Sequence, residues 1–224
     1  MENTLKWSYL GCLEYEKATR IQEELQSRMI KDNSDVSGYL LILEHKPVIT
    51  AGKFGNDNNL LITDCALRQS GIDIFKANRG GDYTYHGPGQ IVCYPILDLR
   101  RIGMGVKDYV YNLEELIIDV LGNYGIISGR REGYPGVWTG DKKIAFIGIN
   151  VKRYVSMHGF SLNYDVDTVN YTYMNPCGIN GLEVVSIRDL YGGDLDMDNL
   201  VKQVVSSFIK IFNCTLIEER EVVT

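Results

Sequence analysis

Arg79-Gly80-Gly81-Asp82-Tyr83-Thr84-Tyr85-His86-Gly87-Pro88-Gly89-Gln90, residues 79–90 of a chain of 224, is the most distinctive part of this sequence. It interleaves four glycines and one proline with arginine, threonine, histidine, two tyrosines and glutamine. Glycines let the backbone approach a ligand closely, and successive amides can form a concavity for an anion. Neither standard glycine-rich nucleotide-binding pattern is present. The stretch therefore indicates either a binding loop or an ordinary turn-rich connection.

Hydrophobic periodicity on both sides of this stretch predicts helices and strands in an irregular order. Helical spacing is expected over Glu14–Met29, Leu61–Gln69, Val106–Tyr124 and Asp196–Phe212. Extended segments are expected over Gly38–Leu43, Pro47–Ala51, Ile72–Lys76, Gln90–Leu97, Gly136–Trp138, Lys142–Val151, Val155–Asn163 and Thr215–Glu218. Because helices and strands do not alternate, the order favours an α+β fold with a mixed or antiparallel sheet over a doubly wound fold.

Two local signals refine the strands. Pro95 lies inside Gln90–Leu97, and because proline has no N–H to donate, we expect that strand at a sheet edge or at a bulge. Thr139-Gly140-Asp141 separates two strand-like segments and predicts a hairpin.

Composition and charge limit the classes of function. The chain is 45% hydrophobic with 23 glycines and 5 prolines, as in folded domains rather than disordered chains. The formal net charge of −6 argues against nucleic acid as a partner. Apolar runs such as Tyr39–Leu43 are too short to cross a bilayer. The first residues, MENTLKW, lack the apolar core of a secretory signal, so a cytoplasmic location is expected.

Cysteine usage singles out one residue. The five cysteines are Cys12, Cys65, Cys93, Cys177 and Cys214, and no pair has C-x-x-C spacing. An odd number without that spacing argues against a zinc ribbon and a disulfide framework. Cys177 lies between Pro176 and Gly178, so it is expected on a loop, where exposure beside a positive charge makes a thiol reactive. The alternative is a loop cysteine without a role.

Two lysines, Lys142 and Lys143, open the apolar segment that follows the predicted hairpin turn. Strict alternation would place Lys143 on one face with Ala145 and Ile147, and Lys142 on the other with Ile144 and Phe146. An inward lysine would have its pKa lowered by desolvation and would exchange protons near neutrality. The alternative is that both lysines are solvated at a turn.

The three histidines, His45, His86 and His158, leave two other possibilities open. Three histidines can hold zinc, but their wide separation matches no ligand spacing. A Cys–His pair that uses His86 or His158 with Cys177 would support hydrolysis.

Five segments together resemble the lipoyl(octanoyl) transferases, the octanoyl-[acyl-carrier-protein]:protein N-octanoyltransferases of lipoate biosynthesis. RGGDYTYHGPGQIVCYPILDL carries the resemblance, supported by LEHKPVITAGK, KKIAFIGINV, SMHGFSLN and MNPCGINGLEVVSI. These matches occur in family order over Leu43–Ile187. The resemblance implies a single domain over 1–224 with the fold of biotin and lipoate protein ligases, a mixed β-sheet flanked by helices.

The resemblance also implies roles. Cys177 would carry the acyl group as a thioester, and Lys143 would be the basic partner that activates it. The substrate pocket would be lined by Arg79, Gly80, Gly81, Asp82, Tyr83, Thr84, Tyr85, His86, Phe146, Ile147, Gly148, Gly159, Phe160 and Ser161. Octanoyl-acyl carrier protein would be the donor, and the acceptors would be lipoyl domains of 2-oxoacid dehydrogenases and the glycine cleavage H protein. No metal, ATP or other cofactor is implied.

One residue departs from the family pattern, and several alternatives remain. Phe146 stands where the family usually has a small residue, which puts the acyl-chain preference in doubt. Acidic carrier domains would need a local basic patch, which we expect from Arg130, Arg131, Lys142, Lys152 and Arg153. The competing functions are an ATP-dependent lipoate or biotin protein ligase of the same fold, a non-catalytic module that binds lipoyl domains, and the Cys–His hydrolase.

Overall fold

A mixed sheet forms the centre of the molecule, of which the computed structural model describes residues 3–31 and 34–219. In spatial order, its eight strands are β11 (Cys214–Glu218), β1 (Asn3–Leu13), β2 (Gly38–His45), β6 (Gln90–Leu97), β10 (Val155–Asn163), β9 (Lys142–Lys152), β8 (Tyr134–Thr139) and β7 (Gly129–Arg131). Strand β1 pairs in parallel with β11 and β2, and the other pairs are antiparallel. The predicted mixed sheet is confirmed.

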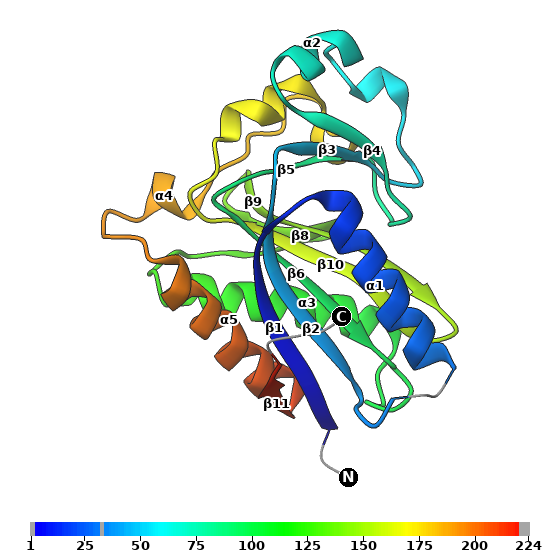
Figure 1. Ribbon diagram of the computed structural model, residues 1–224. Coiled ribbons are helices and arrows are strands. Elements are labelled where there is room, and N and C mark those ends of the chain that lie inside the picture. Colours follow the sequence, from blue (N-terminus) through cyan, green and yellow to red (C-terminus); the bar gives the residue numbers. More distant parts are fainter. Residues whose placement is uncertain (1–2, 32–33, 220–224) are drawn as a thin grey trace.

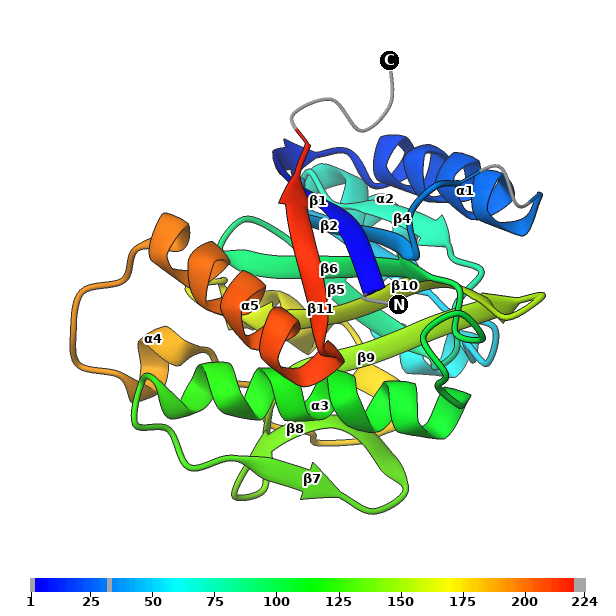
Figure 2. The ribbon, with the colours of Figure 1, turned by 90° about the horizontal axis from the view of Figure 1, so that it is seen from below.

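Helices cover both faces of this sheet. Helix α1 (Tyr15–Ile30) packs on one face, and α3 (Val106–Gly122) and α5 (Met197–Phe212) lie side by side on the other (Figures 1 and 2). All three were predicted from their spacing, with ends shifted by one or two residues. Within the described residues, no helix combines the length and the apolar character needed to cross a membrane.

A second, three-stranded sheet lies above the first in Figure 1, in the order β4 (Asp73–Lys76), β3 (Val48–Ala51) and β5 (Tyr83–His86). Its side chains share a core cluster with Phe146 of β9, so the two sheets pack against each other. Strand β5 lies inside the glycine-rich stretch, which is therefore not all loop as the sequence suggested.

Short helices complete the connections between these strands. They are η1 (Asp57–Asn59), α2 (Asp64–Gln69), η2 (Thr168–Tyr173), η3 (Pro176–Gly178) and α4 (Ile187–Leu190). Helix α2 begins three residues later than the predicted Leu61–Gln69. Two of these helices, η1 and η3, lie next to each other.

The prediction that Pro95 marks a sheet edge or a bulge is wrong, because β6 is a central strand without a register shift. Strand β6 lies between β2 and β10, where Leu40 pairs with Pro95. Facing β10, the continuous ladder ends at the pair of Phe160 and Cys93. Beyond it, the Ser156 hydroxyl bonds the Pro95 carbonyl at 2.7 Å. A central strand accommodates the proline because its missing N–H faces this opening in the ladder.

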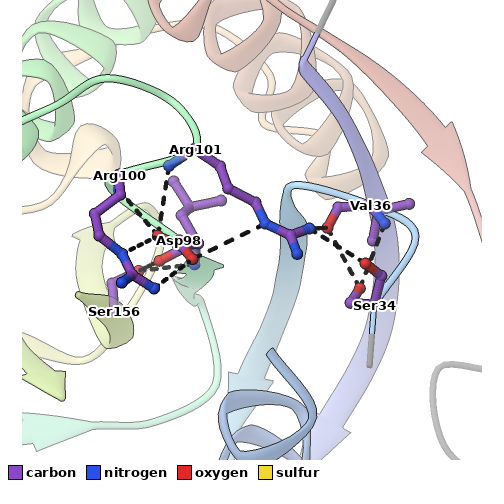
Figure 3. A network of polar contacts seen from close by, with 7 residues as sticks. Ser34, Val36, Asp98, Arg100, Arg101 and Ser156 are labelled. Atoms are coloured by element: carbon purple, nitrogen blue, oxygen red, sulfur yellow. Dashed lines mark hydrogen bonds and ion pairs between the residues drawn. The ribbon is translucent and has the colours of Figure 1, made fainter. Parts of the chain in front are cut away.

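A buried carboxylate fixes the end of β6. Asp98 is only 4% exposed and bonds the side chain and backbone N–H of Arg100 at 3.0–3.3 Å. Arg101 also approaches Asp98, and its guanidinium donates to the carbonyls of Ser34 and Val36 at 3.2 and 3.1 Å (Figure 3). The network joins the connection before β2 to the end of β6, two neighbouring strands of the sheet.

Replacement of Gly159 by alanine should destabilise the fold. A Cβ at this position would overlap the Cys93 carbonyl oxygen and come within 2.7 Å of Pro95 Cδ. Because backbone atoms cannot move aside locally, we expect Gly159→Ala to lower the free energy of unfolding by about 2 kcal/mol, measured by urea denaturation. Gly122→Ala is the control, since its Cβ would meet no atom within 4 Å. Equal stability of the two variants would contradict this packing.

Candidate active site

The site contains one pair of reactive side chains brought together from distant parts of the chain. Lys143 Nζ lies 3.6 Å from Cys177 Sγ, within the distance of a hydrogen bond to sulfur. Lys143 is the second residue of β9, and Cys177 lies in η3, 34 positions later. The Cys177 residue is exposed, while Lys143 is 1% exposed. The buried ammonium therefore approaches the thiol from inside the protein.

A β-bulge turns Lys143 toward the site. In the ladder between β8 and β9, Val137 pairs with Ala145 but Trp138 pairs with Lys143, so Ile144 is an extra residue. The predicted alternation is therefore wrong for Lys143, which shares a face with Phe146 instead of with Ala145. Its Nζ lies 5.1 Å from the centre of the Phe146 ring. A bulge reverses the facing of residues on one side of it, and hydrophobic alternation does not reveal it.

The surroundings of Lys143 combine burial with few acceptors. Its Nζ donates to the Pro135 carbonyl at 2.8 Å and lies 4.9 Å from the centre of the Trp138 ring. Burial lowers the pKa of Lys143, and this effect is opposed by Cys177 and by the Glu114 carboxylate. An amine of this kind can exchange a proton closer to neutral pH than an exposed lysine.

The loop that carries Cys177 is held in a strained conformation. Cys177 has φ 57° and ψ 19°, the left-handed region that residues with a side chain seldom adopt. The loop is anchored on η1, because the Asn175 N–H donates to the Asn59 carbonyl at 2.7 Å. Asn59 in turn bonds the Asp82 carboxylate, which also accepts the Asn56 N–H at 3.1 Å. The glycine-rich stretch therefore supports the thiol through η1.

A pocket opens beside Cys177 between the two sheets. In addition to Cys177, it is lined by Tyr15, Arg79, Gly81, Asp82, Tyr83, Thr84, His86, Val92, Tyr94, Phe146, Ile147, Gly148, His158, Gly159, Phe160 and Ser161. Gly148 and Gly159, both in the pocket wall, pair directly across β9 and β10. The surface that the wall exposes is mostly apolar, which suits an apolar ligand.

Arg79 brings a buried positive charge to the pocket wall. Its guanidinium donates to the Thr50 carbonyl and hydroxyl at 2.7 and 2.6 Å and to the Gly80 carbonyl at 3.0 Å. The Arg79 Cδ lies 3.0 Å from the position that a Cβ at residue 148 would take. Gly148 therefore makes room for the arginine. The acceptors of the guanidinium's hydrogen bonds to Thr50 and Gly80 are neutral oxygens.

The histidines are buried and neutral. Burial lowers the pKa of His45 to about 4 and that of His158 to about 3, and it lowers the pKa of His86 as well. His86 bonds Gln90 at 2.7 Å. Among the described residues, the side chain hydrogen-bonded to the Cys177 thiol is Lys143 and not a histidine. Within this same part of the chain, no group of three or more histidine, cysteine or acidic side chains is placed to hold a metal ion.

Most of the residues expected at the pocket come together there, but Gly80 and Tyr85 do not line it. The Gly80 N–H pairs with the Ile149 carbonyl at 2.9 Å, and the Tyr85 ring packs edge-on against Tyr171. Four lining residues were not foreseen: Tyr15, Val92, Tyr94 and His158. Tyr15 and Val92 belong to segments predicted as a helix and a strand, and periodicity does not separate a core face from a pocket wall. The position of His158 next to Gly159, within SMHGFSLN, was the sequence signal that could have placed it in the pocket wall.

The predicted basic patch is wrong. Lys142 and Lys152 are at opposite ends of the extended strand β9, about 33 Å apart at the usual rise per residue. Arg153 follows Lys152 and lies far from the site with it. Three of the five cations have acidic partners: Arg130 bonds Glu114 and Glu115, Arg131 approaches Asp141, and Lys142 pairs with Glu183.

Comparison with known proteins shows the family of the chain. Residues 14–209 match the family model described as the lipoyl protein ligase A/B catalytic domain. The chain is 42% identical over 213 residues to an octanoyltransferase of Alkaliphilus metalliredigens, covering 95% of this chain and 97% of that one. It is 40% identical over 205 residues to an octanoyltransferase of Desulforamulus reducens, covering 91% and 89%.

The fold is found in solved structures of more distant proteins. A bipartite lipoate protein ligase from Thermoplasma acidophilum superposes with a TM-score of 0.76 at 14% identity, over 99% of this chain and 88% of that one. This likeness confirms the expected ligase-type fold, and the more similar octanoyltransferases show the family within that fold. The chain belongs to the octanoyltransferases, acyltransferases that share the lipoyl protein ligase A/B catalytic domain.

Proposed function

We propose that this enzyme transfers an octanoyl group from octanoyl-acyl carrier protein, through a thioester on Cys177, to a lysine of a lipoyl domain. The observation that carries the mechanism is the 3.6 Å contact between Lys143 Nζ and Cys177 Sγ at the edge of a largely apolar pocket. The pocket would take the acyl chain, and the exposed thiol would meet the carbonyl carbon at the surface, where two protein partners can reach it.

The first half-reaction loads the enzyme. The Lys143 ammonium stabilises the Cys177 thiolate, which attacks the carbonyl carbon of the donor thioester. The tetrahedral intermediate collapses with loss of the carrier's phosphopantetheine thiolate, which takes a proton from Lys143. The bond broken and the bond formed are both thioesters, so the step needs no nucleotide.

The second half-reaction delivers the acyl group. Lys143 is now a neutral amine, and burial disfavours its charged form. It takes a proton as the acceptor's lysine amine attacks the acyl-enzyme, an amide forms, and the Cys177 thiolate leaves. The ammonium of Lys143 then faces the thiolate again, and the starting state is restored. The lowered pKa of Lys143 makes both of its protonation states accessible during one cycle.

Acyl-chain preference depends on Phe146 near the reacting groups. Its ring stacks on Tyr171 with a centroid distance of 5.2 Å and an interplanar angle of 8°. Because the same ring lies 5.1 Å from Lys143 Nζ, its bulk narrows the pocket beside the thioester. Phe146 therefore shapes the entrance of the acyl chain.

The proposal extends to the acceptors, the extent of the domain and the compartment. The acceptors would be lipoyl domains of 2-oxoacid dehydrogenases and the glycine cleavage H protein, and the whole chain, 1–224, would act as one domain. Residues 1–2, 32–33 and 220–224 of that domain lie outside the described part. The five cysteines are free thiols, which fits a reducing compartment such as the cytoplasm.

An ATP-dependent ligase is the second candidate, because the Thermoplasma acidophilum protein of the same fold is a lipoate protein ligase. A ligase would make an acyl-adenylate from free octanoate and would not require Cys177. Pyrophosphate release from ATP and free octanoate would therefore favour the ligase over the transferase.

Loss of the thiol should abolish the acyl-enzyme. Incubation with octanoyl-acyl carrier protein should add one octanoyl group to the wild-type protein, and Cys177→Ala should show no adduct by intact mass spectrometry. Cys12→Ala is the control, because Cys12 is also an exposed thiol but lies on β1. An adduct that persists in Cys177→Ala would refute the proposed nucleophile.

Loss of the buried amine should slow the reaction without removing the nucleophile. We expect Lys143→Ala to reduce the rate of acyl-enzyme formation by about 100-fold or more, measured in single-turnover experiments. Lys142→Ala is the matched control, since the neighbouring Lys142 points to an ion pair with Glu183 at the surface. Similar rates in the two variants would show that the contact with Cys177 has no catalytic consequence.

A further inference from the structure

One peptide group connects Lys143 to a carboxylate on the far side of β8. The Pro135 carbonyl accepts from Lys143 Nζ at 2.8 Å. The N–H of the same peptide group, that of Gly136, donates to Glu114 Oε1 at 3.0 Å. Glu114 lies on α3, and its residue is 8% exposed. The carboxylate and the amine therefore bind opposite ends of a single peptide dipole.

We propose that Glu114 is a positioning residue that orients and charges Lys143 through the peptide group between Pro135 and Gly136. The proposal rests on the function assigned above to Lys143. A carboxylate that accepts from the N–H polarises the peptide, and the carbonyl at its other end becomes a stronger acceptor for an ammonium. Glu114 is not among the residues that line the pocket, so it acts on Lys143 without touching the substrate.

The backbone at Gly136 is built for this connection. Gly136 has φ 123°, a conformation that glycine tolerates and residues with a side chain rarely adopt. A Cβ there would come within 2.8 Å of Lys143 Cε and 2.5 Å of the Ala145 carbonyl oxygen. The absence of a side chain thus lets the peptide lie directly against the lysine stem.

The charges around this connection come from three elements besides β9. Glu114 from α3 and Cys177 from η3 both favour the charged form of Lys143, against the effect of burial. Arg130 from β7 donates to Glu114 Oε2 at 3.0 Å and to Glu115 Oε2 at 2.6 Å, so it partly neutralises the carboxylate from outside. Lys142 and Glu183 pair with each other toward solvent.

Glu115 provides a matched control. It follows Glu114 on the same helix, carries the same charge and bonds the same arginine, but its side chain is 41% exposed. The Gly136 N–H bonds Glu114 and not Glu115. A change at Glu115 therefore repeats the loss of charge and the loss of one Arg130 contact, while the link to the peptide group remains.

The test measures the protonation of Lys143 directly, by NMR titration of ¹³Cε-labelled lysines in the full-length protein, with the Lys143 signal assigned from Lys143→Arg. Glu114→Gln keeps an acceptor for the Gly136 N–H and removes the charge. Because a negative charge favours the ammonium, its removal should lower the titration midpoint of Lys143 by about half a pH unit or more. Glu115→Gln should change the midpoint by clearly less.

Arg130→Gln is a second variant, and it is expected to shift the titration midpoint of Lys143 in the opposite direction. Loss of the guanidinium leaves the Glu114 carboxylate less neutralised, so the Lys143 midpoint should rise. Because the Arg130 side chain is part-exposed, Arg130→Gln is expected to fold. It therefore tests the proposal even if Glu114→Gln does not fold. An unchanged midpoint in Arg130→Gln, or equal midpoints in wild type, Glu114→Gln and Glu115→Gln, would overturn the proposal.

Kinetics separate positioning from substrate binding. In Glu114→Gln, the kcat for octanoyl transfer should fall while the KM for the donor is unchanged, because Glu114 does not line the pocket. A rise in KM with unchanged kcat would contradict the positioning role. The NMR titration needs no acyl donor, so it tests Glu114 even if octanoyl transfer itself is not observed.

Discussion

The contact between the Lys143 ammonium and the Cys177 thiol is the interaction on which the rest of the site depends, and each partner arrives there in an unusual backbone conformation. An extra residue in β9, Ile144, turns Lys143 toward the pocket. A left-handed residue in η3 presents Cys177. The left-handed conformation of Cys177 costs free energy, which the surrounding packing must supply. The larger sheet and η1 are the parts that supply it.

The glycine-rich stretch contributes to the site in two ways. Part of it forms β5 and lines the pocket, with Arg79 bringing a buried positive charge. Asp82 also lines the pocket, and its carboxylate bonds Asn56 and Asn59. These bonds hold the segment of η1 on which the loop of Cys177 rests. The functional groups in this stretch therefore serve both the ligand pocket and the placement of the nucleophile.

The buried titratable side chains near the pocket differ in charge. The buried histidines are neutral because burial lowers their pKa values. Lys143 remains the titratable group beside the thiol, held by a peptide carbonyl and influenced by Glu114. The aromatic rings of Trp138 and Phe146 lie near its ammonium and exclude water from that side.

The sequence by itself determined the α+β class, the three long helices, most of the strands and the family, and it singled out Lys143 and Cys177, because periodicity and motifs are local properties. It missed β1, β5 and β7. It did not determine which face Lys143 occupies or that Pro95 lies in a central strand, since a bulge and an opening in a ladder depend on the neighbouring strand. The predicted basic patch was wrong because β9 holds Lys142 and Lys152 at its opposite ends and because Arg130, Arg131 and Lys142 pair with acidic side chains. Glu114 entered the site only through the packing of α3 against β8, a contact between segments that no local pattern joins.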